Sequence, residues 1–190
     1  MQPSIPETTS TSHVEVERRT QALVTSCTAR NLTANDLDAA KRLFVKDQDW
    51  GEYYGGLFRQ EAESIIARPP SAVKGLFLSD GSLAAVGVVE KAGFDFAYWT
   101  LTWVMVDNAY RGQGLGRAII DTLIEHAKRE QSVGYRNQNC RILISAVLDQ
   151  AQFYAHYWGF KPLMEGPLQG EQLMGLDAKG PFLPLPPLQE

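Results

Sequence analysis

The chain has 190 residues, of which 44% are hydrophobic and 21% charged, as expected for one globular domain with a buried core. A net charge of −4 and a pI of about 5.4 argue against a nucleic-acid-binding protein and mildly favour a cationic partner such as an amine. No apolar run is long enough to span a membrane, and the N-terminus lacks the apolar core of a signal peptide.

The two cysteines predict neither a metal site nor a disulfide. Cys27 and Cys140 lie in no Cys-x-x-Cys or Cys/His spacing, so no zinc or other metal site is expected. Small buried thiols fit a reducing compartment, which predicts a cytoplasmic protein. We expect one domain over residues 21–177, between a loose polar tail at 1–20 and a proline-rich extended tail at 178–190.

Hydrophobic periodicity and turn residues predict mixed helices and strands. Thr33, with Asp36 three residues later, resembles a capping box, and Asp80-Gly81 is a two-residue hairpin signal. In chain order we expect a strand at 21–29, a helix from Thr33 to about Lys46, an aromatic and glycine-rich loop at 47–56, a second helix ending before Pro69, antiparallel strands at 73–79, 82–91 and 96–106, a helix at 114–130, a strand at 141–148, a short helix at 150–158, and strands at 161–164 and 172–176.

A glycine turn joins the strand at 96–106 to the helix at 114–130. It reads Arg111-Gly112-Gln113-Gly114-Leu115-Gly116-Arg117. The first N–H groups of a helix have no partner inside it, and the helix dipole adds partial positive charge there. Glycines let the backbone approach an anion closely, and the two arginines add donors that suit phosphate oxygens. The turn therefore predicts a phosphate or diphosphate site.

Two common phosphate-binding folds do not fit this turn. A P-loop is excluded because no Gly-Lys-Ser/Thr ends it. The glycine spacing is Gly-x-Gly-x-Gly rather than the Gly-x-Gly-x-x-Gly of dinucleotide-binding folds, and three antiparallel strands precede it.

The sequence here resembles the GNAT acetyltransferase superfamily. The family's Arg/Gln-x-x-Gly-x-Gly/Ala motif is matched by Arg111, Gly114 and Gly116. Its second mark, a Phe-Tyr pair followed by Gly-Phe on a short helix, is matched by Phe153-Tyr154 and Gly159-Phe160, with four residues rather than the usual three between Tyr and Gly.

The resemblance covers about residues 23–176 and implies a fold and a cosubstrate. The implied fold is α+β: a mixed, mostly antiparallel sheet of six or seven strands, about four helices, and splayed fourth and fifth strands. The implied cosubstrate is acetyl-CoA, with no metal. The residues that would bind it are Val104, Met105, Val106, Arg111, Gly112, Gln113, Gly114, Leu115, Gly116 and Arg117.

By the same resemblance, the amine attacks the thioester directly and the departing thiolate takes a proton from a helix tyrosine. Tyr154 matches the family position, and Tyr157, one turn later, is the alternative. A general base or a water chain must remove the proton of the amine. Glu90 and Asp95, near the turn before the strand at 96–106, are the candidate bases.

The acceptor is predicted to be a primary amine of a small molecule. Trp50, Tyr53 and Tyr54 could form an aromatic wall for a cation, or could instead pack the loop onto the sheet. Two other functions stay open: a protein acetyltransferase acting on lysine or an N-terminus, and a non-catalytic acyl-CoA sensor. Members of the superfamily are frequently dimeric, so a homodimer is a further prediction, whereas no nucleic-acid or membrane partner is expected.

Overall fold

The computed structural model describes residues 21–92, 98–134, 140–164 and 170–177, without the side chains of 132–134. The predicted tails, 1–20 and 178–190, and the candidate base Asp95 lie outside the described residues. In chain order the elements are β1 (Thr28–Asn31), η1 (Ala34–Asp36), α2 (Leu37–Val45), α3 (Gly51–Ile66), β2 (Ala72–Phe77), β3 (Leu83–Ala92), β4 (Tyr98–Val106), η2 (Asn108–Tyr110), α4 (Leu115–Gly134), β5 (Arg141–Val147), α5 (Leu148–Trp158), β6 (Lys161–Pro162) and β7 (Glu171–Asp177).

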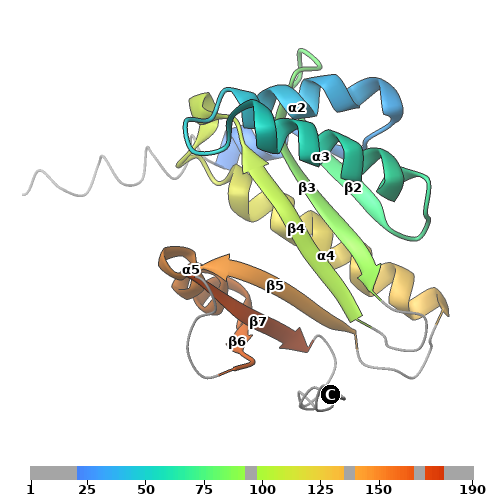
Figure 1. Cartoon of the computed structure of the whole chain (residues 1–190), viewed down its shortest axis with the longest axis vertical. Coiled ribbons are helices and arrows are strands. Elements are labelled where there is room, and N and C mark those ends of the chain that lie inside the picture. The colour runs from blue at the N-terminus through green and yellow to red at the C-terminus, as the bar shows by residue number, and fades with distance from the viewer. Residues whose placement is uncertain (1–20, 93–97, 135–139, 165–169, 178–190) are drawn as a thin grey trace, which may run out of the picture.

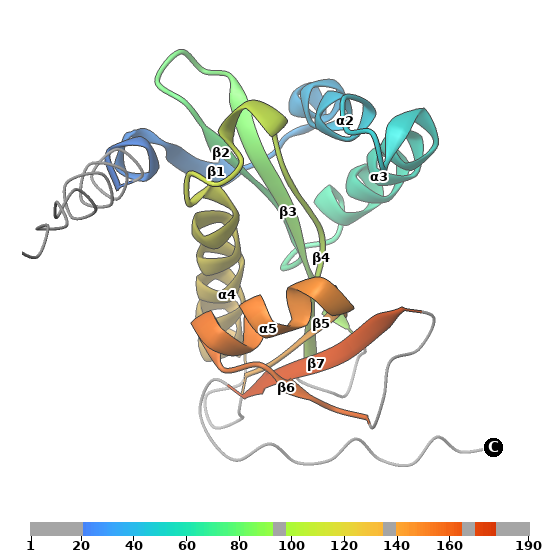
Figure 2. The same ribbon diagram turned by 90° about the vertical axis from the view of Figure 1, so that its left-hand side faces the viewer.

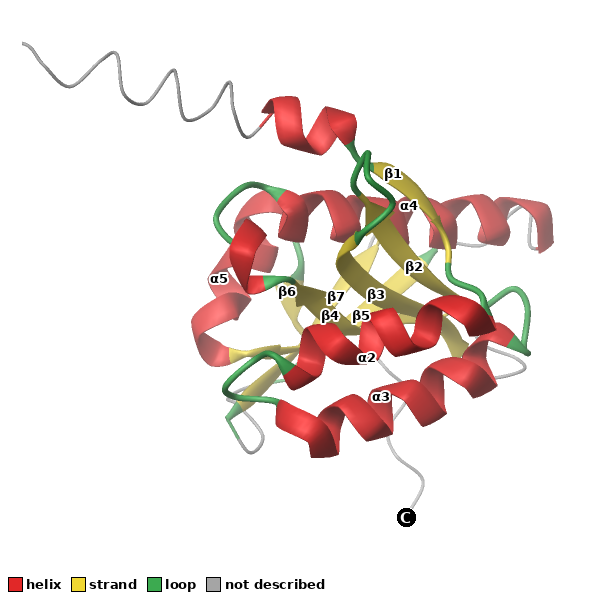
Figure 3. Ribbon diagram, turned by 90° about the horizontal axis from the view of Figure 1, so that it is seen from above, coloured by secondary structure: helices red, strands yellow, loops and turns green. Residues whose placement is uncertain are grey.

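The strands form one seven-stranded sheet in the order β1-β2-β3-β4-β5-β7-β6. All neighbours are antiparallel except β4 and β5, which run parallel. Helices α2 and α3 cover one face of β2–β4, and α4 covers the other (Figures 1 and 3). Figure 2 shows α5 lying over β5 and β7. The predicted fold class, including its three consecutive antiparallel strands, is confirmed.

Two apolar clusters hold these layers together. The larger one lies on the α4 face and contains Trp99, Ile119 and Leu123, together with Tyr154 and Phe160 from the α5 region. The smaller one lies under α2 and α3. Gly87 in β3 lets α4 approach the sheet closely, since a Cβ at this position would lie 2.7 Å from Cδ1 of Leu123.

The capping box predicted at the first helix is present. Both the Thr33 backbone N–H and its hydroxyl donate to Asp36 Oδ2, at 2.8 Å each. Asp36 also pairs with Arg30, and this contact holds the pKa of the Asp36 carboxyl far below its usual value.

Two element predictions were wrong. The strand predicted at 21–29 is replaced by a helical segment at 21–26, followed by the strand β1. The segment places Leu23, Val24 and Cys27 against the larger core cluster, which a short alternating pattern could not reveal. The loop predicted at 47–56 is shorter, because α3 already begins at Gly51. No described helix combines the length and the apolar character that a membrane crossing requires.

Candidate active site

The glycine turn presents unpaired backbone donors at the start of α4. Gly112 and Gly114 adopt φ angles of +73° and +80°, which only glycine adopts without strain. Within the described chain, no acceptor is found for the N–H groups at 112, 114, 115, 116 and 117, and the first helical bond of α4 is from Ala118 N to Gly114 O at 3.0 Å. N–H groups left without an acceptor in this way are suited to an anion.

Strand β4 carries a bulge next to this turn. Thr102 pairs with Val88 and Met105 with Val86, so Trp103 and Val104 together face the single residue Gly87. Trp103 has φ +53°, a left-handed conformation that costs an aromatic residue about 1–3 kcal/mol. Its ring packs against other aromatic rings that offset this cost, with centroid distances of 5.7–6.1 Å to Phe44, Phe58 and Trp50.

Beyond the bulge, β4 and β5 separate. Their parallel pairing spans only Tyr98 to Leu101 and Arg141 to Ile144, although β4 continues to Val106 and β5 to Val147. The edge of β4 from Thr102 to Val106 therefore has no strand neighbour on this side. The predicted splay of the fourth and fifth strands is confirmed, and it leaves an edge to which an extended amide chain can bond.

A hollow of about 460 Å³ occupies the splay. Its wall includes residues 104–106, the glycine turn, and side chains from the α2–α3 connection and from α5; the last two groups are Asp47, Asp49, Trp50, Gln150, Phe153 and Tyr154. A second hollow of about 730 Å³ adjoins it and shares Gly112, Gly116 and Phe153. The two hollows thus adjoin along the glycine turn, and we call them together the cleft.

The two candidate tyrosines lie in different parts of this cleft. Tyr154 is buried, with 5% of its surface exposed, and lines the hollow beside Val104 and Val106. Burial raises the pKa of its phenol, so the group stays protonated at neutral pH. Tyr157 is exposed and lines the second hollow, where the Arg117 guanidinium lies 5.0 Å from its ring centre.

The two arginines of the turn also have different surroundings. The Arg111 guanidinium pairs with the buried carboxylate of Asp47 and contacts Sδ of Met105 at 3.5 Å. Arg111 therefore ties the end of α2 to β4. Arg117 is exposed, and its nearest carboxylate, on Asp121, lies 3.8 Å away. Of the two guanidinium groups, that of Arg117 is the freer to meet a phosphate.

The remaining turn residues act through their backbones. The Leu115 side chain is fully buried in the core, and the Gln113 side chain bonds back to Ala109 O at 3.1 Å. Their side chains are therefore engaged elsewhere.

The predicted aromatic wall is divided by the structure. Trp50 lines the hollow and is 38% exposed, while its ring also contacts Phe44 and Tyr54. Tyr53 and Tyr54 lie exposed on the first turn of α3, outside the lining of the hollow. Trp50 therefore both packs against Trp103 of β4 and lines the cleft, while its contact with a cation stays a prediction.

The structure does not bring Glu90 to the cleft. Glu90 is paired with Arg68 at 3.1 Å, and its neighbour Thr100 in β4 precedes the splay. The cleft instead contains Asp49, which the structure places next to Trp50. In the described part of the chain, no hydrogen-bond or ion-pair partner is found for the Asp49 carboxylate.

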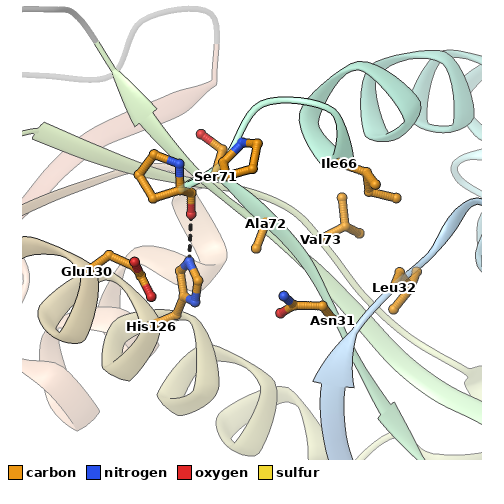
Figure 4. Close-up of a pocket in the computed structure, with 10 residues that line it drawn as sticks. Asn31, Leu32, Ile66, Ser71, Ala72, Val73, His126 and Glu130 are labelled. Carbon is orange, nitrogen blue, oxygen red and sulfur yellow. Dashed lines mark hydrogen bonds between the residues drawn. The ribbon is translucent and has the colours of Figure 1, made fainter.

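A separate hollow of about 240 Å³ lies between α4, β1 and the turn before β2 (Figure 4). His126 Nε2 lies 2.8 Å from Pro70 O, and Nδ1 lies 3.0 Å from Nη2 of Arg129. A carbonyl can only accept, so we assign the hydrogen to Nε2 and the acceptor role to Nδ1. Burial lowers the pKa of His126, which agrees with this neutral form.

Sequence reasoning missed two features of the cleft. The Asp47–Arg111 pair joins residues 64 positions apart, and no local pattern marks it. The bulge at Trp103 lies inside a dense apolar run, where alternation cannot show an extra residue. A glycine at position 87, in the middle of a strand, was the one available signal.

Comparisons with known proteins agree with this geometry. Residues 75–162 match the family model described as an acetyltransferase (GNAT) domain, whereas no curated protein sequence matches the chain. A ribosomal-protein-alanine N-acetyltransferase from Escherichia coli is 21% identical, with a TM-score of 0.60 over 84% of this chain and 98% of that one. The PaiA N-acetyltransferase from Thermoplasma acidophilum, solved with coenzyme A, is 13% identical, with a TM-score of 0.60 over 80% and 99% of the two chains.

A third structure, a chimera of the spermidine N-acetyltransferase SpeG from Vibrio cholerae and hSSAT, is 13% identical, with a TM-score of 0.59 over 80% of this chain and 95% of that one. At these identities the likeness establishes the fold, while the family model adds the sequence pattern across the glycine turn and α5. The resemblance predicted from the sequence is confirmed: residues 75–162 match the acetyltransferase (GNAT) domain, and the described fold is the one that these structures share.

Proposed function

We propose that the protein is an acetyl-CoA-dependent N-acetyltransferase that acts on a primary amine of a small molecule. The observation that carries this proposal is that the glycine turn, the free β4 edge and Tyr154 line the same hollow. The unpaired N–H groups of the glycine turn and the free edge of β4 open into the same space, with Tyr154 in its wall. A diphosphate, an amide-bearing arm and a thioester require these three features in this order.

The glycine turn fits the coenzyme diphosphate. A Cβ at Gly112 would meet nothing within 4 Å, so the backbone faces open space there. The N–H groups at 114–117 supply donors at the positive end of α4. The edge from Val104 to Val106 would bond the amides of the pantetheine arm, in the manner of an added strand.

Acetyl-CoA supplies an activated acyl group, and the protein residues position it and move protons. The neutral amine nitrogen forms a bond to the thioester carbon, and the carbon–sulfur bond breaks. Tyr154 donates its proton to the departing sulfur, because its buried phenol is protonated and it lies beside the β4 edge. A backbone N–H of Val104 or Val106 would polarise the carbonyl.

The acceptor would enter past Asp49 and Trp50. A protonated amine is attracted to a carboxylate and to an aromatic ring face, and both line the cleft. We propose that Asp49, rather than Glu90, removes the ammonium proton directly or through water, since Glu90 is held by Arg68. Tyr53 and Tyr54 would extend the entrance, on the exposed first turn of α3.

Calorimetry with coenzyme A, followed by a thiol-release assay with acetyl-CoA, tests the proposal. The acceptor panel should contain polyamines, free amino acids and peptides with a free N-terminus or lysine, because the structural neighbours include enzymes named for spermidine and for a ribosomal protein. We expect coenzyme binding and acetylation of a small amine. Acetylation of peptides alone would replace the acceptor class with a protein, binding without turnover would leave an acyl-CoA sensor, and indifference to coenzyme A would overturn the assignment.

A further inference from the structure

The part of the cleft beyond the glycine turn has a third wall, made by the helical segment 21–26. The hollow of about 730 Å³ is lined by the glycine turn and the start of α4 on one side and by Phe153 and Tyr157 of α5 on another. Gln21 and Val24 complete the lining. The position of the segment in the sequence, nearly 90 residues before the turn, gives no hint of this contact.

The segment is fixed in place by its own contacts. Leu23, Val24 and Cys27 pack against the larger core cluster. The Thr25 hydroxyl donates to Gln21 O at 2.9 Å, and the Ser26 hydroxyl donates to Leu23 O at 2.7 Å. The Cys27 N–H closes the segment by donating to Val24 O at 3.2 Å. Gln21 and Val24 are therefore held towards the hollow by packing and hydrogen bonds.

The chemistry of this hollow differs from that of the splay. It contains the exposed guanidinium of Arg117, which lies over the Tyr157 ring, and the exposed ring of Phe153. Asp121, the one carboxylate in the lining, accepts from Nε1 of Trp158 at 2.6 Å. An arginine beside aromatic rings suits a heteroaromatic base that carries phosphate.

We propose that Val24 and Gln21 form the outer wall of a subsite for the nucleotide end of the acyl donor. Val24 provides an apolar surface for the base, and the Gln21 amide provides hydrogen bonds at the rim. The inference rests on the proposed function. It adds that the N-terminal segment makes the enzyme select a nucleotide-bearing thioester over a donor that ends at pantetheine.

Val24→Asp, compared with Thr25→Asp, tests this wall at an ionic strength of 0.15 M. Both variants place the same charge on the same segment, but Thr25 does not line the hollow. For Val24→Asp we expect the KM for acetyl-CoA to rise about tenfold with little change in kcat, because a carboxylate opposes the phosphates and loses the apolar contact. The KM for S-acetylpantetheine should stay unchanged, and Thr25→Asp should alter neither donor.

Gln21→Glu is the second variant, since Gln21 is exposed and its replacement is nearly isosteric. It should raise the KM for acetyl-CoA severalfold at low salt, and the effect should shrink at 0.5 M salt. Two results would contradict the proposed wall if Gln21→Glu also leaves the KM for acetyl-CoA unchanged: Val24→Asp changes the KM for both donors equally, or Val24→Asp and Thr25→Asp have equal effects. Neither result would contradict the acetyltransferase activity. A wild-type protein that uses neither donor would instead overturn the proposed function itself.

Discussion

The two ends of α4 use their polar groups in opposite ways. At its start, the N–H groups at 112 and 114–117 find no acceptor in the described chain, and β4, the strand that leads into the turn, is strained at Trp103. In its second half, side chains bind the helix to the sheet: His126 to Pro70 O, and Gln131 to Nε1 of Trp99 at 3.2 Å. Side chains anchor one end to the rest of the protein, and the backbone donors of the other are left for a ligand.

This difference explains where strain and open donors occur together. A strained aromatic residue in a strand and a row of unpaired N–H groups each cost stability, and stable folds seldom retain either without a reason. Here the strained residue Trp103 directly precedes Val104, and Val104 lines the same hollow as Gly112. The separate hollow between α4, β1 and the turn before β2 also has polar walls, but both ring nitrogens of His126 already have hydrogen-bond partners there.

Gly114→Trp should produce the largest change. The residue has φ +80°, and an indole at this position would fill the space before the free N–H groups. We expect the Kd for coenzyme A to rise at least about a thousandfold in calorimetry. Gly81→Trp is the matched control, because Gly81 has φ +82° and lies in the hairpin turn away from the cleft. Retained affinity in Gly114→Trp would place the diphosphate elsewhere.

Tyr154→Phe should produce the second-largest change. The substitution removes the hydroxyl group, which is the proton donor, and leaves the packing of the ring intact. We therefore expect kcat to fall about 100-fold while the KM for acetyl-CoA stays within a factor of about two. Tyr157→Phe keeps the ring under Arg117 and should change kcat little. The reverse pattern in steady-state assays would transfer the acid role to Tyr157, and two unaffected variants would assign it to water.

Asp47→Asn tests the contact that holds the cleft end of α2 to β4. Asp47 is buried, so losing its charge beside Arg111 should lower the free energy of unfolding by about 2 kcal/mol in urea denaturation. Asp38→Asn is the control, since Asp38 pairs with Arg59 in the open and should cost less than about 0.5 kcal/mol. Equal losses would show that the Asp47 pair is no more than a surface contact.

The glycine turn and the sheet were predictable from the sequence because their signals are local. Gly112 and Gly114 serve where φ is positive, Asp80-Gly81 closes a hairpin, and the apolar run at 141–148 forms the strand β5, although one face is exposed at Ser145 and Val147. These features need only neighbouring residues to be recognised, and the first of them, set in a strand–turn–helix, was enough to indicate the family.

The features that failed depend on distant partners. The segment 21–26 is helical, and its apolar residues pack against the larger core cluster. This packing places the segment in the wall of the cleft. Asp47 could not be matched to Arg111 without the fold, and the place of Asp49 in the lining of the cleft was visible only in the structure. Glu90, chosen for its place near a turn, is held by Arg68.

The smallest expected effect concerns the second half of α4, which side chains anchor to the rest of the protein. Burial lowers the pKa of His126 in the folded state below 6.5; the hydrogen bond to Pro70 O and the charge of Glu130 oppose this shift, and the charges of Lys74 and Arg129 add to it. The unfolded chain therefore binds a proton more readily, so this group should lower the free energy of unfolding as pH falls below about 6.5. The loss should level off only once the folded-state pKa is passed.

His126→Gln, measured by urea denaturation at pH 7.5 and 5.5, isolates this contribution. At pH 7.5 it should cost about 1 kcal/mol for the disturbed bonds to Pro70 and Arg129. Between the two pH values it should lose less stability than the wild type, because it has no proton to take up at this position. His156→Gln, on the exposed side of α5, should retain the wild-type difference. If the pH dependence of His126→Gln equals that of the wild type, the folded protein accommodates a protonated His126 without loss of stability. The difference between the two ends of α4 would then rest on the glycine turn alone.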